Sequence, residues 1–465
     1  MNLESLQEKK VYPFSYWLNK NWYYHGQLKK FYQFVIPKDV RVLHVGSKSG
    51  YLLHAVHPSL GVGIDDDAQA IYNAQQEFPH LTFIAGELSD LPQDYMFDYV
   101  ILSSVTMEAY DIQQLFEALK PHLHASSRIV IDSYSYIWEP VLSITQWLGM
   151  RRPTQLRNWI SQTDLLNFLD LADFERITCG DQILMPAYMP GISWFLNSFI
   201  AQIPLLSKLC LNKWVIARLK PVQKQQDYSV SIVIPCKNER GNIEAAIARC
   251  PMIGKHTEFI FVDGHSQDGT VVEMERIKKK YQDHDISIFV QDGKGKGDAV
   301  RKGFAHAKGD ILMILDADLT TPPEELPKFF NALISGKGEF INGSRLIYGM
   351  ESGSMRFLNL LANYCFGLGF TWLLGQKIKD TLCGTKVLFK SDYEKIVKAR
   401  SFFGNFDPFG DFDLLFGAAK QNLKIIDMPI HYKNRTYGTS QIHRFQAGFL
   451  LMRMSFIAFK KFKWR

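Results

Sequence analysis

Residues 310–320 read D-I-L-M-I-L-D-A-D-L-T. The run from Ile311 to Leu315 is apolar throughout, which is typical of a strand buried on both faces of a parallel sheet. Two carboxylates, Asp316 and Asp318, follow at its carboxyl end. Ligands of open α/β sheets bind beyond this end of the strands, and paired carboxylates there suit Mg²⁺ or Mn²⁺. Because a solvated turn can carry the same pair, the surrounding sequence has to decide between the two.

An alternation of strands and helices surrounds this stretch. We predict strands over 228–235, 258–263 and 287–290, and helices over 241–248, 271–280 and 298–308. Such repeats form right-handed crossovers and a parallel sheet. Glu239 and Asp263 then fall at carboxyl ends of strands, and a loop with Lys294 and Lys296 precedes the central strand. Carboxylates can accept hydrogen bonds from a base or ribose, and a metal ion with lysines can neutralise a diphosphate.

Several motifs resemble those of the family 2 glycosyltransferases, which have the GT-A fold. They are P-C-K-N-E (235–239), V-D-G-H-S-Q-D-G-T (262–270), G-K-G-D-A-V-R-K-G (295–303), D-A-D-L-T (316–320), N-G-S-R (342–345) and D-T-L-C-G-T-K (380–386). The last two, with R-T-Y-G at 435–438, resemble the branch that includes dolichol-phosphate mannosyltransferases and polyprenyl-phosphate glycosyltransferases. The resemblance covers about residues 229–445. It implies inverting transfer of a sugar from a nucleotide-diphosphate sugar to a polyprenyl phosphate or another membrane-linked acceptor.

The same resemblance implies roles for individual residues. Those expected to bind the nucleotide sugar are Pro235, Asn238, Glu239, Asp263, Lys296 and Asp316. Asp316 and Asp318 would also hold Mg²⁺ or Mn²⁺. The mannosyltransferases often have a glutamine where this chain has Thr320. A third protein ligand and the choice of metal therefore stay open.

The acceptor determines what further groups the site needs. A lipid phosphate is largely anionic near neutral pH, so it requires cations rather than a base. Arg345, Arg356 and Arg435 are the candidates, although each could instead form a structural ion pair. An alcohol acceptor would require a carboxylate base, for which Asp413 or its neighbour Asp411 is expected.

The first half of the chain has a second nucleotide-binding pattern. V-L-H-V-G-S-K-S-G (42–50) and G-V-G-I-D (61–65) read as strand, glycine turn, helix, and a second strand ending in an acid. With F-I-A-G-E-L (83–88) and F-D-Y-V-I-L (97–102), they resemble the class I S-adenosylmethionine-dependent methyltransferases over about residues 30–180. The resemblance implies S-adenosylmethionine-binding roles for Gly46, Gly50, Asp65 and Glu87.

Two departures from that pattern leave the role of this half open. His44 and Lys48 stand where the family usually has an acid and a glycine. A long cation at Lys48 would crowd the turn and repel a sulfonium. Both a cofactor-binding domain and a non-catalytic scaffold are therefore compatible with the sequence.

Length and composition predict a multidomain α/β protein. With 465 residues, 46% of them hydrophobic, two or three domains are expected. We predict two Rossmann-like doubly wound domains with amphipathic helices: a methyltransferase-like domain (1–180), an apolar connecting segment and linker (181–227), a GT-A domain (228–440) and a basic C-terminal helix (441–465). A net charge of +6 does not suggest a nucleic-acid partner. Scattered cysteines and an N-terminus without an apolar core favour a cytoplasmic location.

Three uncharged or basic apolar stretches suggest a membrane surface. A single membrane crossing by residues 357–376 would separate 380–384 from Asp316, so this stretch should lie in the interface, re-enter, or pack in the core. The run from Arg444 is aromatic and basic, which suits anionic lipids, unless it folds on the domain. Residues 182–207 could lie on a membrane or form a buried helix pair. We therefore expect an enzyme on the inner membrane face.

Three other functions remain open at this point. The chain could be a bifunctional methyltransferase–glycosyltransferase, or its first half could dock the transferase on a membrane or partner. A nucleotidyltransferase could use the same D-x-D pair, and it would release pyrophosphate.

Overall fold

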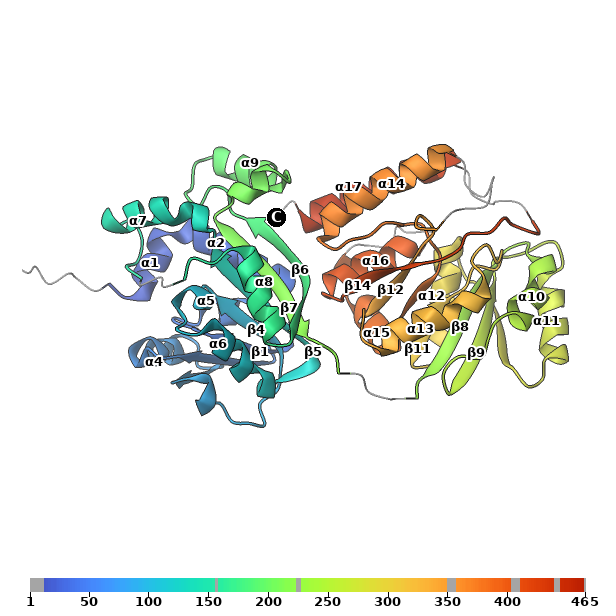
Figure 1. Cartoon of the computed structure of the whole chain (residues 1–465), viewed down its shortest axis with the longest axis horizontal. Coiled ribbons are helices and arrows are strands. Elements are labelled where there is room, and N and C mark those ends of the chain that lie inside the picture. Colours follow the sequence, from blue (N-terminus) through green and yellow to red (C-terminus); the bar gives the residue numbers. More distant parts are fainter. Residues whose placement is uncertain are drawn as a thin grey trace, which may run out of the picture. The chain divides into compact units, whose positions relative to one another are not determined.

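The computed structural model describes residues 12–154, 158–222, 227–348, 357–402, 410–438 and 444–463. The chain divides into two compact units, Met1–Lys220 and Pro221–Arg465. Each is built on one seven-stranded sheet with helices on its faces (Figure 1). The predicted α/β class with two doubly wound domains is confirmed.

The first sheet has the order β3-β2-β1-β4-β5-β7-β6. Its strands are β1 (Arg41–Val45), β2 (Leu60–Asp65), β3 (Thr82–Ala85), β4 (Phe97–Ser103), β5 (Leu123–Tyr134), β6 (Phe174–Gln182) and β7 (Asn212–Leu219). β7 is antiparallel to both of its neighbours, and the five strands from β3 to β5 are parallel. The winding direction reverses between β1 and β4, which is where doubly wound sheets bind ligands.

Helices cover both faces of this sheet. α2 (Trp22–Val35) and α3 (Tyr51–Ala55) pack on the face that contains Val42 and Ile101. α6 (Ile112–Leu119) and α8 (Gln162–Leu171) pack on the opposite face. The remaining helices of the unit are α1 (Phe14–Lys20), α4 (Ala68–Glu77), α5 (Val105–Glu108), α7 (Glu139–Trp147) and α9 (Ile192–Ser198).

The position of β7 corrects the expected domain boundary. The segment 181–227 was expected to connect the two domains, but its residues 212–219 pair with β5 and β6 inside the first sheet. The first unit therefore ends at Lys220 rather than at residue 180. In α9, Trp194 and Phe195 are each about half exposed within this unit (51% and 50%).

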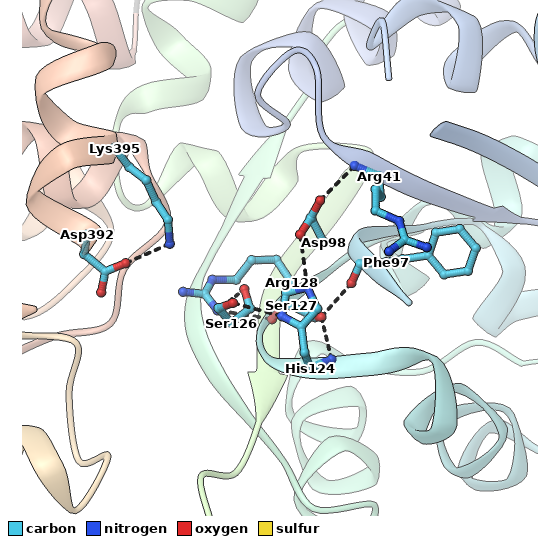
Figure 2. A network of polar contacts seen from close by, with 9 residues as sticks. All are labelled: Arg41, Phe97, Asp98, His124, Ser126, Ser127, Arg128, Asp392 and Lys395. Carbon is cyan, nitrogen blue, oxygen red and sulfur yellow. Dashed lines mark hydrogen bonds and ion pairs between the residues drawn. The ribbon is translucent and has the colours of Figure 1, made fainter. Parts of the chain in front are cut away.

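Polar contacts fix the beginnings of β4 and β5 (Figure 2). The carboxylate of Asp98 accepts a hydrogen bond from the backbone N–H of Arg41 (2.8 Å) and contacts His124 Nε2 (3.0 Å). Ser127 Oγ donates to the carbonyl of Phe97 (2.6 Å). These contacts hold the strands in register where the ladder between β4 and β5 is irregular.

The second sheet has the order β10-β9-β8-β11-β13-β12-β14. Its strands are β8 (Ser229–Cys236), β9 (His256–Asp263), β10 (Asp285–Val290), β11 (Ile311–Ile314), β12 (Phe340–Ser344), β13 (Lys386–Phe389) and β14 (Ile425–Pro429). β13 is antiparallel to β11 and β12, while the other pairs are parallel. All four residues of β11 are buried, as predicted from their apolar run.

The helices of this unit are α10 (Ile243–Ala248), α11 (Thr270–Lys280), α12 (Lys296–His306), α13 (Leu326–Ile334), α14 (Phe357–Leu374), α15 (Lys390–Lys398), α16 (Asp411–Lys420) and α17 (Arg444–Phe462). α12 begins at Lys296, so this lysine belongs to the first turn of the helix rather than to the preceding loop. The ion pair of Lys395 with Asp392 that Figure 2 also draws lies within α15.

α14 and α17 lie side by side in this unit (Figure 1), with the Trp372 and Phe459 rings stacked 5.8 Å apart. α17 buries Leu451, Met454 and Ala458 against the unit. Both helices leave rows of apolar side chains in solvent: Leu361, Tyr364 and Leu368 on α14, and Phe449, Met452 and Phe456 on α17. In the described parts of the chain, no helix has the length and hydropathy required to cross a membrane.

Candidate active site

Four carboxylates gather at one edge of the second sheet. β9, β8 and β11 are adjacent and parallel, so their carboxyl ends meet at the same edge. Asp263 is the last residue of β9, Glu239 follows β8, and Asp316 and Asp318 follow β11. The sheet thus brings together acids that are far apart in the sequence.

Asp316 is paired with the lysine of the glycine-rich segment. Lys296 Nζ lies 2.5 Å from Asp316 Oδ1. Burial opposes the charged form, but the lysine holds the pKa of Asp316 below its ordinary value. Burial likewise opposes the charge on Lys296, whose pKa the Asp316 carboxylate raises. This ion pair therefore keeps both groups charged at neutral pH.

Gly384 closes over this pair. A Cβ at this position would meet Asp316 Oδ2 and Lys296 Nζ well inside van der Waals distance. The D-T-L-C-G-T-K segment therefore contributes to the same site as Asp316. This placement agrees with the expectation that residues 357–376 do not carry the two motifs to opposite sides of a membrane.

Asp318 is held by an arginine and a threonine. Its Oδ2 accepts a hydrogen bond from Arg435 (2.5 Å), and its Oδ1 accepts from the Thr320 hydroxyl (2.8 Å). Arg435 also lies 3.6 Å from Glu239 Oε1. The R-T-Y-G segment thus reaches two of the four carboxylates.

Glu239 and Asp263 are buried acids with unused hydrogen-bonding capacity. Burial raises the pKa of Glu239 to about 7, against the hydrogen bond that Asn242 donates to its Oε2 (2.7 Å). Asp263 is 2% exposed, and its Oδ2 accepts from the Ser266 backbone N–H (3.0 Å). Its Oδ1 has no hydrogen-bond partner among the described residues. Such an acceptor suits a ribose hydroxyl or a base N–H.

Pro235 and Asn238 shape the turn after β8. Pro235 pairs in register with Val262 near the end of the sheet. Asn238 has a left-handed backbone (φ 54°), and its Oδ1 accepts from the Gln267 backbone N–H (2.9 Å). Its side chain therefore braces the neighbouring loop rather than pointing free into the site.

The three expected acceptor arginines differ in their surroundings. Arg345 donates to both carboxylate oxygens of the buried Asp380 (2.7 and 2.9 Å), and its guanidinium lies over the Tyr432 ring. Its charge is already neutralised, so it supports the 380–386 segment. Arg356 lies outside the described residues. Arg435 is the arginine that the structure places at the carboxylate edge.

The expected acceptor base needs a correction. The Asp413 carboxylate accepts from Arg400 (2.5 Å) and lies 3.6 Å from Arg301, so two guanidiniums engage it. The Asp411 carboxylate lies 3.0 Å from Lys386 Nζ and helps to raise the pKa of Lys296. Asp411 is therefore the acid of this pair that faces the Asp316 region.

Asp316 and Asp318 fit a divalent cation, although no cluster of three or more acidic, His or Cys ligands is found in the described ranges. Mg²⁺ in nucleotide sites is commonly bound by one or two carboxylates together with substrate phosphates. The Lys296 and Arg435 cations beside the two acids show that this edge attracts positive charge. The donor set suits Mg²⁺ or Mn²⁺.

The four expected S-adenosylmethionine-binding residues of the first unit differ in their surroundings. Gly46 lines a cavity at the ends of β1 and β4, whereas Gly50 is covered by the Phe83 ring and Glu87 is exposed. Asp65 accepts from the backbone N–H groups of Lys48 (2.8 Å) and Asp67 (3.0 Å). Lys48 lines the same cavity as Gly46, and its Nζ lies 3.0 Å from Glu108 Oε1. Binding of S-adenosylmethionine by these residues stays a prediction.

Comparison with known proteins assigns the second unit. Residues 231–402, less than half of the chain, match the profile of the family described as Glycosyl transferase family 2. The second unit contains a family 2 glycosyltransferase domain. The resemblance of its motifs to this family is thereby confirmed.

Two curated relatives each match a part of this chain. Dolichol-phosphate mannosyltransferase of Saccharomyces cerevisiae is 40% identical over 109 residues, which are 22% of this chain and 40% of the relative. Undecaprenyl-phosphate 4-deoxy-4-formamido-L-arabinose transferase of Salmonella paratyphi B is 37% identical over 103 residues, or 21% of this chain and 32% of the relative. The chain thus spans less than half the length of these relatives.

Solved structures resemble each unit distantly. Glucosyl-3-phosphoglycerate synthase from Mycobacterium tuberculosis is 18% identical, with a TM-score of 0.38 over 50% of this chain and 80% of its own. An S-adenosylmethionine-dependent methyltransferase from Thermotoga maritima is 11% identical, with a TM-score of 0.35 over 45% of this chain and 94% of its own. At these scores the fold assignment rests on the strand orders given above.

The sequence patterns did not predict two features of the glycosyltransferase domain. The charge partner of each metal-binding candidate, Lys296 for Asp316 and Arg435 for Asp318, comes from another motif. Lys386 is fully buried and pairs with Asp411, so it brings a further charge toward Asp316. Its place at the end of D-T-L-C-G-T-K, two residues after Gly384, was the available signal.

Proposed function

We propose that the chain is a metal-dependent, inverting glycosyltransferase that moves a sugar from a nucleotide-diphosphate sugar to a polyprenyl phosphate or another membrane-linked acceptor. The observation that carries this proposal is the edge of the second sheet, where Glu239, Asp263, Asp316 and Asp318 meet Lys296 and Arg435 within a family 2 domain.

The buried acids are suited to bind the nucleoside of the donor. Asp263 offers a carboxylate oxygen without a partner among the described residues, and Glu239 follows the neighbouring strand β8. Pro235 and Asn238 hold the intervening turn. An ionised carboxylate accepts hydrogen bonds and cannot donate them. We therefore expect these acids to select N–H groups of the base and the ribose hydroxyls.

The remaining charges are suited to the diphosphate. Asp316 and Asp318 would hold Mg²⁺ or Mn²⁺, which when bound supplies positive charge to the leaving nucleoside diphosphate. Lys296, positioned by Asp316 at the first turn of α12, would donate to a phosphate oxygen. Gly384 has no side chain, which allows its backbone to approach this pair closely.

An acceptor phosphate needs orientation rather than deprotonation. One of its oxygens would attack the anomeric carbon, the bond to the diphosphate would break, and the configuration would invert. Arg435 is the candidate to orient it, since its guanidinium sits at the carboxylate edge. The names of both curated relatives contain a polyprenyl phosphate, which supports this acceptor class. For an alcohol acceptor, Asp411 would be the base to test first.

We further propose that α14 and α17 bring the enzyme to the inner membrane face. Their apolar side chains form two exposed rows on neighbouring helices, and the basic Lys460 and Lys461 lie at the end of α17. Exposed apolar area of this kind beside cations suits the interface of an anionic bilayer.

A donor panel tests the proposal. The full chain is incubated with polyprenyl phosphate, Mn²⁺ and labelled nucleotide sugars, and transfer of label into organic solvent is measured. We expect one donor to label the lipid and release nucleoside diphosphate, with Asp318→Asn lowering transfer by roughly 10²-fold or more. Release of pyrophosphate would identify a nucleotidyltransferase instead. Full transfer by Asp318→Asn would refute the metal assignment.

A further inference from the structure

The first unit contains a cavity of about 270 Å³ that the proposed glycosyl transfer does not use. It lies at the carboxyl ends of β1 and β4, where the winding direction of the sheet reverses. α1, α2 and α7, which Figure 1 shows at one end of this unit, contribute to its walls. Aromatic rings dominate the lining: Phe14, Trp17, Tyr24, Tyr51, Tyr134 and Trp138. A cavity of about 150 Å³ can already hold a benzene molecule, so this one has room for a ring with a polar group.

The charged groups of the lining are mostly cations. Lys48, Arg151 and Arg152 line the cavity, together with Glu108, which lies 3.0 Å from Lys48 Nζ. The guanidinium of Arg151 stacks on the Tyr134 ring (5.5 Å), and that of Arg152 stacks on Phe14 (5.4 Å). Within residues 12–154 and 158–222, no carboxylate forms an ion pair with either arginine. The cavity thus presents two guanidiniums held against aromatic rings, and no carboxylate of the described part of this unit pairs with them.

A buried imidazole also indicates that the cavity takes a ligand with a polar group. His44 lines the cavity and is 2% exposed, and neither ring nitrogen has a hydrogen-bond partner among the described residues. Burial and then the Lys48 charge lower the pKa of His44 to about 3, so the ring is neutral near pH 7. A buried polar group without a partner is costly, and a bound ligand would remove that cost.

We propose that this cavity binds a small aromatic carboxylate or phosphate, and not S-adenosylmethionine. The rings of the lining would stack on the aromatic part of the ligand. The two arginines would pair with its anionic group, Lys48 would add a hydrogen bond although it also pairs with Glu108, and His44 would make a hydrogen bond to a polar atom. The two arginines would repel a sulfonium. The glycine turn would therefore lie beside a site that prefers an anionic ligand over a cationic one such as S-adenosylmethionine.

Matched probes test the charge preference. The full chain is titrated calorimetrically with phenyl phosphate, benzoate, benzyl alcohol, benzyltrimethylammonium and S-adenosylmethionine. Quenching of Trp17 and Trp138 fluorescence gives a second signal from the cavity walls. We expect at least one anion to bind roughly tenfold or more tightly than the neutral alcohol, since a charge-assisted hydrogen bond contributes about 1.5–3 kcal/mol. The relative affinities of phenyl phosphate and benzoate identify the anionic group.

Variants locate the binding site. Arg152→Gln and Lys48→Met should each weaken binding of the anion about tenfold. Lys38→Met, on the exposed surface of the same unit, and Lys294→Met, in the second unit, should leave it unchanged. Because Arg152 is half-buried on the rim, Arg152→Gln should fold even if Lys48→Met does not. Tighter binding of S-adenosylmethionine than of either anion, no anion binding at about 10 mM, or binding that survives both substitutions would overturn the proposal.

Discussion

Gly384→Ala is expected to abolish the proposed sugar transfer without unfolding the protein. Gly384 does not have a left-handed backbone, so alanine can adopt its conformation. The new Cβ would nevertheless overlap Asp316 Oδ2 and Lys296 Nζ, the two groups that we assign to the metal and the diphosphate. To restore van der Waals contact, these atoms have to move by about 1 Å or more. A misplacement of that size can cost about 100-fold in rate, which corresponds to about 2.7 kcal/mol of transition-state stabilisation.

The stability of the variant should change little. Both overlapping atoms are ends of side chains that can rotate, and replacing glycine by alanine reduces the entropy of the unfolded chain by about 0.4–1 kcal/mol. We expect the free energy of unfolding to stay within about 1 kcal/mol of the original. The measurement pairs an initial rate of sugar transfer into organic solvent with a denaturant melt.

Gly369→Ala is the matched control for this experiment. Gly369 lies in α14 of the same unit, and apart from the backbone of its own helix no heavy atom lies within 4 Å of the Cβ that it would gain. This variant should keep both its activity and its stability. If Gly384→Ala transfers sugar at more than half the original rate, the Asp316–Lys296 pair does not form the reaction centre, and the assignment of the site is refuted.

Three further predictions concern charge and surface. Burial raises the pKa of Glu239 to about 7, so the contribution of Glu239 to the free energy of unfolding should fall as the pH rises from about 4.5 to 7. Donor affinity should rise through pH 7 as the carboxylate ionises. Glu239→Gln should remove this pH dependence, and an unchanged pH profile of KM in that variant would contradict the prediction. Arg435→Ala should release Asp318, so calorimetry should show Mn²⁺ binding that is up to about fivefold tighter, while the rate of sugar transfer falls. The control Arg249→Ala, which breaks an exposed ion pair with Glu324, should change neither quantity. Weaker Mn²⁺ binding by Arg435→Ala would exclude competition between this arginine and the metal. The double variant Phe456→Asp/Met452→Asp should sediment less with anionic vesicles while its stability stays the same. The control Val272→Asp, on the exposed side of α11, should sediment like the original protein. Equal sedimentation of the original protein and both variants would show that α17 does not contact the membrane.

Local sequence patterns predicted most of the strands near the site. The buried β11 followed from five consecutive apolar residues, and the acids at the ends of β8, β9 and β11 followed from parallel pairing. These features depend on neighbours in the chain and on the geometry of one sheet. They were therefore accessible before any long-range contact was known.

Partners of charged side chains could not be predicted in this way. Asp413 and Asp411 are two residues apart, yet Arg400 and Arg301 engage the first while Lys386 engages the second. Arg345 looked available for a phosphate, but Asp380 neutralises it. Each of these pairings joins residues from different elements, and the charge pattern of a single motif does not contain that information.

The sequence by itself determined the two α/β units, the central strand at 311–314 and the membership of residues 231–402 in the glycosyltransferase family. Only the tertiary structure showed that β7 belongs to the first sheet, that Gly384 closes on Asp316, and that Lys48 lies in a cavity with Arg151 and Arg152. The physical reason is that strand formation and motif spacing are local properties of the chain. Which side chains share one dry, charged site depends on how distant segments pack.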